Sequence, residues 1–153
     1  MTASSANRSL EPIGLVPIGY VATSYDDTSP IPSQASENSE VTGRVIVRPE
    51  LVDGLLGLEN YRHLWLLTWL HVQPAQHERH LQLVPRATEA RGQVQGVFAS
   101  RSPQRPNPIG LSLVRQLAVA ENVVTFGGVD LLDRTPVLDI TPWCADCDLP
   151  PEP

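Results

Sequence analysis

Short apolar segments separated by turns dominate the chain, and they restrict its fold more than any other feature. Seven segments rich in Val, Ile, Leu or aromatic residues are typical of strands: 13–21, 42–48, 63–71, 94–100, 111–120, 123–129 and 136–140. Only residues 49–58 have helical spacing, with Pro49 at the first position and Gly57 near the end. Alternating strand–helix units are missing, which argues against a doubly wound sheet. The pattern predicts an all-β fold, a small antiparallel barrel or sandwich with one short helix and long loops.

Two of these segments allow more specific predictions. The run HLWLLTWLH, residues 63–71, is apolar and aromatic throughout, which predicts a buried central strand. The turn Ala120-Glu121-Asn122 joins two apolar runs and predicts a hairpin.

The length of 153 residues fits one domain. We expect a flexible tail at residues 1–10, a folded domain at 11–148 and a disordered end at 149–153. No apolar run is long enough to span a membrane, and the first residues lack the features of a signal peptide, so we expect a cytoplasmic protein. The two cysteines, Cys144 and Cys147, are too few for a disulfide framework.

The charge is unevenly distributed. The net charge is −6, and every basic residue is Arg, since the chain contains no Lys. Residues 62–115 hold seven Arg and only Glu78 and Glu89, a local balance of +5. The acidic total argues against broad adhesion to nucleic acid, whereas the basic middle allows one local anion site.

The most unusual segment is RSPQRPNPIGL, residues 101–111. Its three prolines fix their own φ angles and bias the preceding residues toward extended backbone. Such a stiff loop would hold Arg101, Arg105 and Asn107 in fixed directions, which suits recognition of a carboxylate, a phosphate or a nucleobase edge. The alternative is a surface turn whose prolines only oppose aggregation.

A second polar segment lies among apolar residues near the C-terminal end. Asp130, Asp133 and Asp139 interrupt the run DLLDRTPVLDI. Asp133 is either a functional carboxylate or the first residue of an Asx turn. Asp139 falls in a strand that reads as buried, so we expect it to be a structural partner of an Arg or, less favoured, a functional group.

The histidines give a weaker signal. His71, His77 and His80 together with the CxxC of Cys144 and Cys147 form a conceivable zinc site, which we rank last because Pro74 interrupts any helix that would align the histidines. His77 and His80 are better interpreted as solvated loop residues. We therefore predict no metal site. The sequence lacks glycine-rich phosphate loops, and the lack of Lys excludes Schiff-base chemistry.

These segments together resemble the TsaA-like family, also called the tRNA-methyltransferase O (TrmO) family. The resemblance rests on GVFASRSPQRPNPIGLSLV, HLWLLTWLH, DLLDRTPVLDITPW and PIGYVATSY, and it extends over about residues 13–148. It implies a small antiparallel β-barrel that binds S-adenosyl-L-methionine (SAM). It further implies an N-methyltransferase that acts on N6 of threonylcarbamoyladenosine-37 in tRNA, and a homodimer with the cofactor near the subunit interface.

The resemblance assigns the cofactor-binding positions residue by residue. They are Pro32, Ser33, Gln34, His63, Leu64, Arg101, Leu111, Asp133, Arg134, Thr135 and Pro136. We expect Arg101 to bind the cofactor carboxylate, Asp133 to hold the ribose or sulfonium, and Asn107 to orient the acceptor nitrogen. Asn107 and Asp133 are thus the candidate catalytic residues.

Two positions depart from the family pattern. The family usually has Pro-Arg-Gln where this chain has Pro32-Ser33-Gln34, and Asp-Gly-Thr-Pro where it has Asp133-Arg134-Thr135-Pro136. If that turn requires a positive φ, either Arg134 is strained there or the chain adopts another turn.

Two alternatives to a tRNA methyltransferase stay open. The net charge of −6 and the missing C-terminal extension of some bacterial members favour a methyltransferase with a small-molecule acceptor. The other alternative is a module that binds SAM without catalysis. For assembly, Trp65 and Trp69 supply apolar surface with few helices to cover it, so we expect a homodimer.

Overall fold

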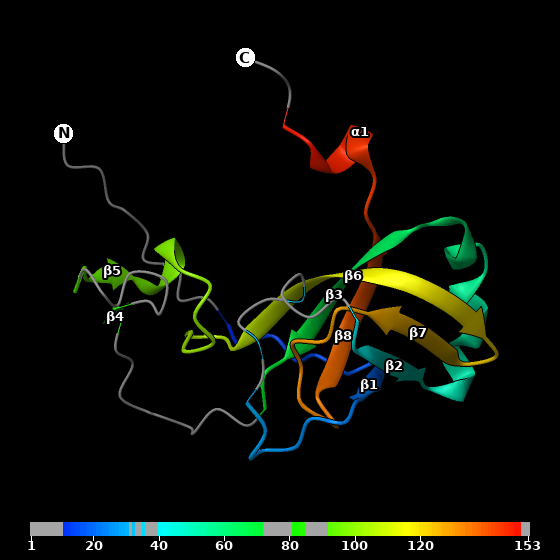
Figure 1. Ribbon diagram of the computed structural model, residues 1–153, viewed down its shortest axis with the longest axis horizontal. Coiled ribbons are helices and arrows are strands. Elements are labelled where there is room, and N and C mark those ends of the chain that lie inside the picture. The colour runs from blue at the N-terminus through cyan, green and yellow to red at the C-terminus, as the bar shows by residue number, and fades with distance from the viewer. Residues whose placement is uncertain are drawn as a thin grey trace.

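The computed structural model describes residues 11–30, 32, 35, 40–71, 81–84 and 92–150. Six antiparallel strands close a barrel in the order β1-β2-β7-β6-β3-β8 (Figure 1). Their bounds are β1 Gly19–Ala22, β2 Thr42–Val47, β3 His63–Trp69, β6 Ile109–Ala120, β7 Val123–Gly127 and β8 Pro136–Pro142. The prediction of a small antiparallel β-barrel is confirmed. No helix in these residues is long and apolar enough to cross a membrane.

The remaining elements are short. β4 Gln82–Leu83 and β5 Gln95–Gly96 form a separate two-stranded sheet, followed by the 3₁₀ helix η5 Val97–Ala99. The predicted helix at 49–58 consists of two 3₁₀ helices, η2 Pro49–Leu55 and η3 Leu58–Asn60, because Gly57 between them takes a φ of 85°. A helical turn, α1 Ala145–Asp148, follows β8.

Two predicted strands are shorter in the structure than in the sequence. Residues 11–18 are not a strand, and Ile13 is 83% exposed. Pro12 and Pro17 lack the amide hydrogen that a ladder needs, so pairing begins where the Ile18 amide donates to the Val137 carbonyl at 2.8 Å. The segment predicted at 94–100 becomes β5 and η5, because the Ser100 amide and hydroxyl both donate to the Val97 carbonyl and close a turn.

The barrel interior is filled by alternate residues of the strands. Phe126, Leu64, Leu66, Val21, Val45, Val114, Val124 and Val137 have at most 1% of their surface exposed. Each such side chain contributes about 1.5–3 kcal/mol by leaving water.

The strand β3 lies between β6 and β8, as expected of a central strand, but it is fully buried on one face only. Leu64, Leu66 and Thr68 point into the barrel, whereas Trp65, Leu67 and Trp69 alternate with them and are half-buried on the outside. Side chains of this strand therefore alternate between the two faces although the sequence is apolar on both. The outer face of the strand is available for a partner.

The antiparallel order gathers three long connections at one end of the barrel, here called the loop end. They are the connections from β1 to β2, from β3 to β6 and from β7 to β8 (Figure 1). The opposite end, here called the far end, carries η2, η3 and the β6–β7 hairpin. The predicted hairpin turn is confirmed, with Glu121 at a φ of 53°.

Candidate functional site

Asp133 is fixed in the β7–β8 connection by hydrogen bonds to the segment that follows β1. Its Oδ1 accepts from the Thr23 amide at 3.1 Å, and its own amide donates to the Tyr25 carbonyl at 2.7 Å. The side chain is half-buried, and no other described residue bonds its carboxylate. One carboxylate oxygen can therefore accept from a ligand while the other keeps the loop in place.

The rest of this turn is held just as firmly. The Thr135 hydroxyl, 2% exposed, donates to the Leu132 carbonyl at 2.8 Å. At its start, the Ser112 hydroxyl of β6 donates to Asp130 Oδ1 at 2.8 Å. The carboxylates at 130 and 133 thus anchor the connection to β6 and to the residue that follows β1.

Arg134 takes the left-handed conformation that the family's usual glycine would adopt freely. Its φ is 66°, its amide donates to the Val21 carbonyl at 2.8 Å, and its guanidinium lies 5.3 Å from the Tyr20 ring centroid. The left-handed region costs a residue with a Cβ about 1–2 kcal/mol, and the cation–π contact offsets about 0.5–1 kcal/mol of that cost. The expectation of a strained Arg134 is confirmed.

This strain predicts an order of stability among variants. Both Arg134→Gly and Arg134→Ala lose the contact with Tyr20, but only alanine keeps the Cβ. We expect Arg134→Gly to exceed Arg134→Ala in unfolding free energy by about 1 kcal/mol. Urea unfolding of the two purified variants measures the difference, and an alanine variant as stable as the glycine one would contradict the strained turn.

The proline-rich connection between β5 and β6 presents one of its two guanidinium groups outward. Arg101 is exposed, whereas Arg105 folds back, with Nη1 donating to the Ser100 carbonyl at 2.8 Å and the Val97 carbonyl at 3.1 Å. Its guanidinium also lies 5.9 Å from the Phe98 ring centroid. Arg105 therefore braces the loop, which corrects the expectation that both arginines are positioned for recognition.

The end of this connection is fixed to β3. The Leu70 amide donates to the Pro108 carbonyl at 2.8 Å, and the Ile109 amide donates to the Asn107 carbonyl at 2.7 Å. The Asn107 residue is exposed. His71, which we considered only as a possible zinc ligand, lies two residues after the end of β3 at this same end and is a further candidate; its position just after a strand was the available signal.

The β1–β2 connection also reaches the loop end. Ala35 packs against Gly128, where an added Cβ would lie 2.9 Å from the Ala35 carbonyl oxygen. Nearer β1, the Asp26 carboxylate accepts from the hydroxyls of Thr28 at 2.7 Å and Ser29 at 2.9 Å. These bonds, that from Thr28 foremost, lower the pKa of Asp26. Pro32 is half-buried, while Ser33 and Gln34 lie outside the described residues.

His63 and Leu64 are not brought to the loop end of their own chain. They begin β3, which runs from the far end toward the loop end, and the His63 ring packs edge-on against Trp143 at 6.1 Å. Leu64 is 0% exposed inside the barrel, so its side chain has no surface for a ligand. Leu111, in contrast to Leu64, lies on the outer face of β6, where it is 54% exposed.

Asp139 corrects another expectation. It is exposed on β8 and accepts from the Ile140 amide at 2.9 Å, so it is not buried, and no arginine of the described residues is paired with it. Leu67 is paired with Asp139 on the outer face, and the register of β8 against β3 shifts after this pair, so that Thr68 lies opposite Val137.

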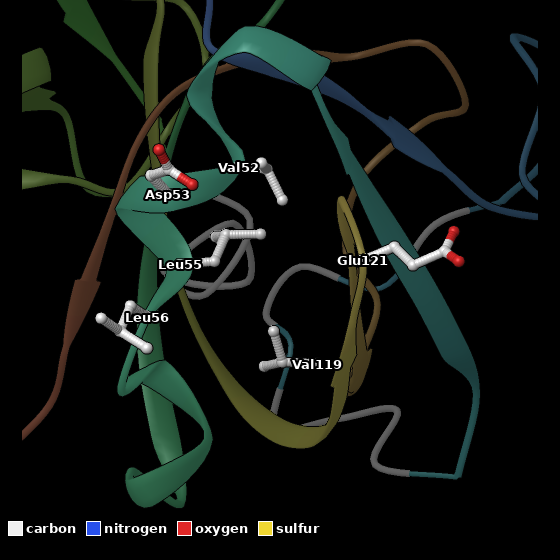
Figure 2. A pocket seen from close by; sticks show the side chains of 6 residues that line it. All are labelled: Val52, Asp53, Leu55, Leu56, Val119 and Glu121. Atoms are coloured by element: carbon white, nitrogen blue, oxygen red, sulfur yellow. The ribbon is translucent and has the colours of Figure 1, made fainter.

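A hollow of about 320 Å³ lies at the far end, between η2 and the β6–β7 hairpin. Val52, Leu55 and Val119 face it, and the Glu121 side chain points away from them (Figure 2). None of the predicted site residues lines this hollow. The candidate site is therefore the loop end, because the connection that holds Asp133, Arg134, Thr135 and Pro136 and the connection that holds Arg101 and Asn107 both leave the barrel there.

Comparison with known proteins shows to which family this chain belongs. The family model described as the tRNA-methyltransferase O N-terminal domain matches residues 20–149. The chain belongs to this family. It is 38% identical over 137 residues to a probable S-adenosyl-L-methionine-binding protein of Methanothermobacter thermautotrophicus, covering 89% of this chain and 93% of that protein.

Enzymes with larger chains belong to the same set of relatives. The tRNA (adenine(37)-N6)-methyltransferase of Mus musculus is 36% identical over 138 residues, which cover 88% of this chain and 31% of the mouse protein. The crystal structure of TrmO from Pseudomonas aeruginosa superposes with a TM-score of 0.74 at 32% identity, covering 95% of this chain and 61% of that one. This chain thus spans less than two thirds of either relative.

The residues that the structure describes do not support the zinc site that we ranked last. His77 and His80 lie outside the described residues. Within the described ranges, no three His, Cys, Asp or Glu side chains are grouped so that they could hold a metal ion. The expected tail at 1–10 and residues 151–153 of the expected disordered end also fall outside these ranges.

Proposed function

We propose that this chain binds SAM at the loop end and transfers its methyl group to N6 of the modified adenosine at position 37 of tRNA. The observation that carries the proposal is that two loops held by internal hydrogen bonds, one with exposed Arg101 and one with Asp133, belong to connections at the same end of a barrel of the TrmO family. Relatives named as SAM-binding proteins and as tRNA (adenine(37)-N6)-methyltransferases support it.

The residues at the loop end match the chemistry of SAM. The exposed guanidinium of Arg101 suits the cofactor carboxylate, and the oxygen of Asp133 not bonded to Thr23 suits a ribose hydroxyl or the ammonium group. Leu111 offers apolar surface at the start of β6 for the adenine ring. The carboxylate, the adenine ring and either the ribose or the ammonium group of the cofactor thus each have a candidate partner.

The proposed reaction depends on positioning. When bound, SAM supplies an electrophilic methyl group on a sulfonium sulfur. Arg101 and Asp133 would hold the methyl donor, and the exposed carboxamide of Asn107 would orient the acceptor nitrogen in line with it. The backbone bonds that fix residues 107–109 and 133–135 reduce the reorganisation needed in the transition state.

A small-molecule acceptor is the second candidate, favoured by the net charge of −6. Mass spectrometry of tRNA nucleosides from cells with and without the gene separates the two. We expect the N6-methylated nucleoside to disappear without the gene and to return with the wild-type copy. Unchanged nucleosides together with SAM binding by the purified chain would favour the small-molecule acceptor or a binding module.

We also propose that the chain is a homodimer through the outer face of β3 and β6. On this face Trp65 is paired with Leu113, Leu67 with Leu111 and Trp69 with Ile109. Leu111 is 54% exposed, and Leu113 and Ile109 are each 39% exposed, so the face is apolar and open. Because Leu111 is also a cofactor-binding candidate, the proposed interface adjoins the proposed SAM site.

A charge on this face should separate the protomers. We expect Leu113→Asp to shift the mass from that of a dimer, about 33 kDa from twice 16.7 kDa, to that of a monomer. Light scattering at micromolar concentration measures it. Leu56→Asp is the matched control, because Leu56 is 91% exposed at the far end and the variant should stay dimeric. A wild-type monomer would contradict the interface.

A further inference from the structure

Cys144 and Cys147 lie on one helical turn at the end of β8. Cys144 is extended, with φ −140° and ψ 140°, and directly precedes α1. The amides of Cys147 and Asp148 both donate to the Cys144 carbonyl, at 3.1 and 2.9 Å. The side chains of Cys144 and Cys147 are close enough for a hydrogen bond between their thiols. The two residues are therefore near the short separation that a disulfide requires, with Cβ atoms about 3.5–4.5 Å apart.

The turn is held in place by one carboxylate. Asp148 Oδ2 accepts from the Cys144 amide at 2.8 Å, and Asp148 Oδ1 accepts from the Trp65 indole nitrogen at 3.0 Å. The two thiols are therefore fixed near each other against the barrel. Both are free, Cys144 half-buried and Cys147 exposed.

The surroundings disfavour a thiolate at Cys147. Hydrogen bonding with the Cys144 side chain raises the pKa of the Cys147 thiol, and the carboxylates of Asp148 and Asp146 raise it further. A low thiol pKa stabilises the reduced form of a dithiol, because that form is then a thiolate. Without such stabilisation the disulfide form is relatively more favoured. The same raised pKa slows attack at neutral pH and predicts faster reaction as the pH rises.

We propose that Cys144 and Cys147 form a reversible dithiol–disulfide couple that exchanges with small-molecule disulfides. The exposed Cys147 thiolate attacks one sulfur of a disulfide R–S–S–R, which forms a mixed disulfide and releases one R–S⁻. The Cys144 thiolate then attacks the Cys147 sulfur and releases the second R–S⁻. In total, two protein thiols and one R–S–S–R give one protein disulfide and two R–SH.

Alkylation and intact-mass spectrometry test this couple. The full chain is incubated with glutathione disulfide and EDTA at increasing pH, quenched with a maleimide and weighed. We expect a chain lighter by two hydrogen atoms and without maleimide, formed faster at higher pH and reversed by dithiothreitol. Two alkylated thiols, a stable glutathione adduct of the wild type, or a disulfide between two chains would each overturn the proposal.

Single variants assign the order of attack. We expect Cys144→Ser to stop at a glutathione adduct on Cys147, and Cys147→Ser to form its adduct more slowly, because Cys144 is half-buried. Equal or reversed rates would contradict Cys147 as the attacking thiol. Circular dichroism before oxidation verifies that both variants are folded, and neither position belongs to the proposed SAM site.

Discussion

Arg101→Ala is expected to weaken SAM binding by about ten- to a hundredfold. The substitution removes a charge-assisted hydrogen bond to the cofactor carboxylate worth about 1.5–3 kcal/mol, at about 1.4 kcal/mol per tenfold change. Folding stability should change little, because Arg101 is exposed and no described group bonds its side chain. Isothermal titration with SAM measures the affinity, and urea unfolding measures the stability.

Two further variants make this result specific. Arg101→Lys should recover only part of the affinity, since an ammonium group cannot form the two parallel bonds of a guanidinium. Arg62→Ala is the matched control, because Arg62 is an equally exposed arginine at the far end and should keep the affinity within a factor of about two. If Arg62→Ala lost affinity while Arg101→Ala kept it, the site would have to be moved.

Asp133→Ala is expected to impair both folding and SAM binding. It removes the acceptor for the Thr23 amide, a bond to a charged group worth about 1.5–3 kcal/mol, and this bond joins the β7–β8 connection to the residue after β1. It also removes the oxygen proposed to accept from the cofactor, which should lower the affinity by a further tenfold or so.

Asp133→Asn separates these two roles. The asparagine carbonyl can still accept from Thr23, so most of the stability should return. Its amide nitrogen cannot accept from a ribose hydroxyl, so the affinity should stay low. Urea unfolding and SAM titration of the same preparations give both quantities. An asparagine variant that binds SAM like the wild type would show that the charge of Asp133 has no part in binding.

The sequence predicted the barrel and the stiff loop because both follow from local rules. Strand-like segments without helical connections leave few architectures, and three prolines between residues 101 and 109 exclude regular structure there. The strain at Arg134 could also be inferred, because the motif placed an ordinary residue where the family uses glycine. These features depend on the backbone more than on distant contacts.

The predictions that were wrong or incomplete concern residues whose surroundings depend on contacts that cannot be inferred from the sequence. Arg105 and Arg101 have the same side chain and similar neighbours, and only the η5 turn places the Val97 and Ser100 carbonyls within reach of Arg105. The run 63–71 is largely apolar on both faces, so it could not show which of its side chains face the barrel interior. His63 and His71 both border β3, and only the direction of that strand in the closed barrel shows that His71 reaches the loop end.

Hydrogen exchange of the purified chain with and without SAM tests the central claim most directly, because it reports where the cofactor binds. We expect SAM to slow exchange in peptides from the β7–β8 connection, residues 128–135, and from the loop of residues 100–111, while η2 and the β6–β7 hairpin stay unchanged. Protection at the far-end hollow, or no protection at saturating SAM, would contradict a SAM site at the loop end.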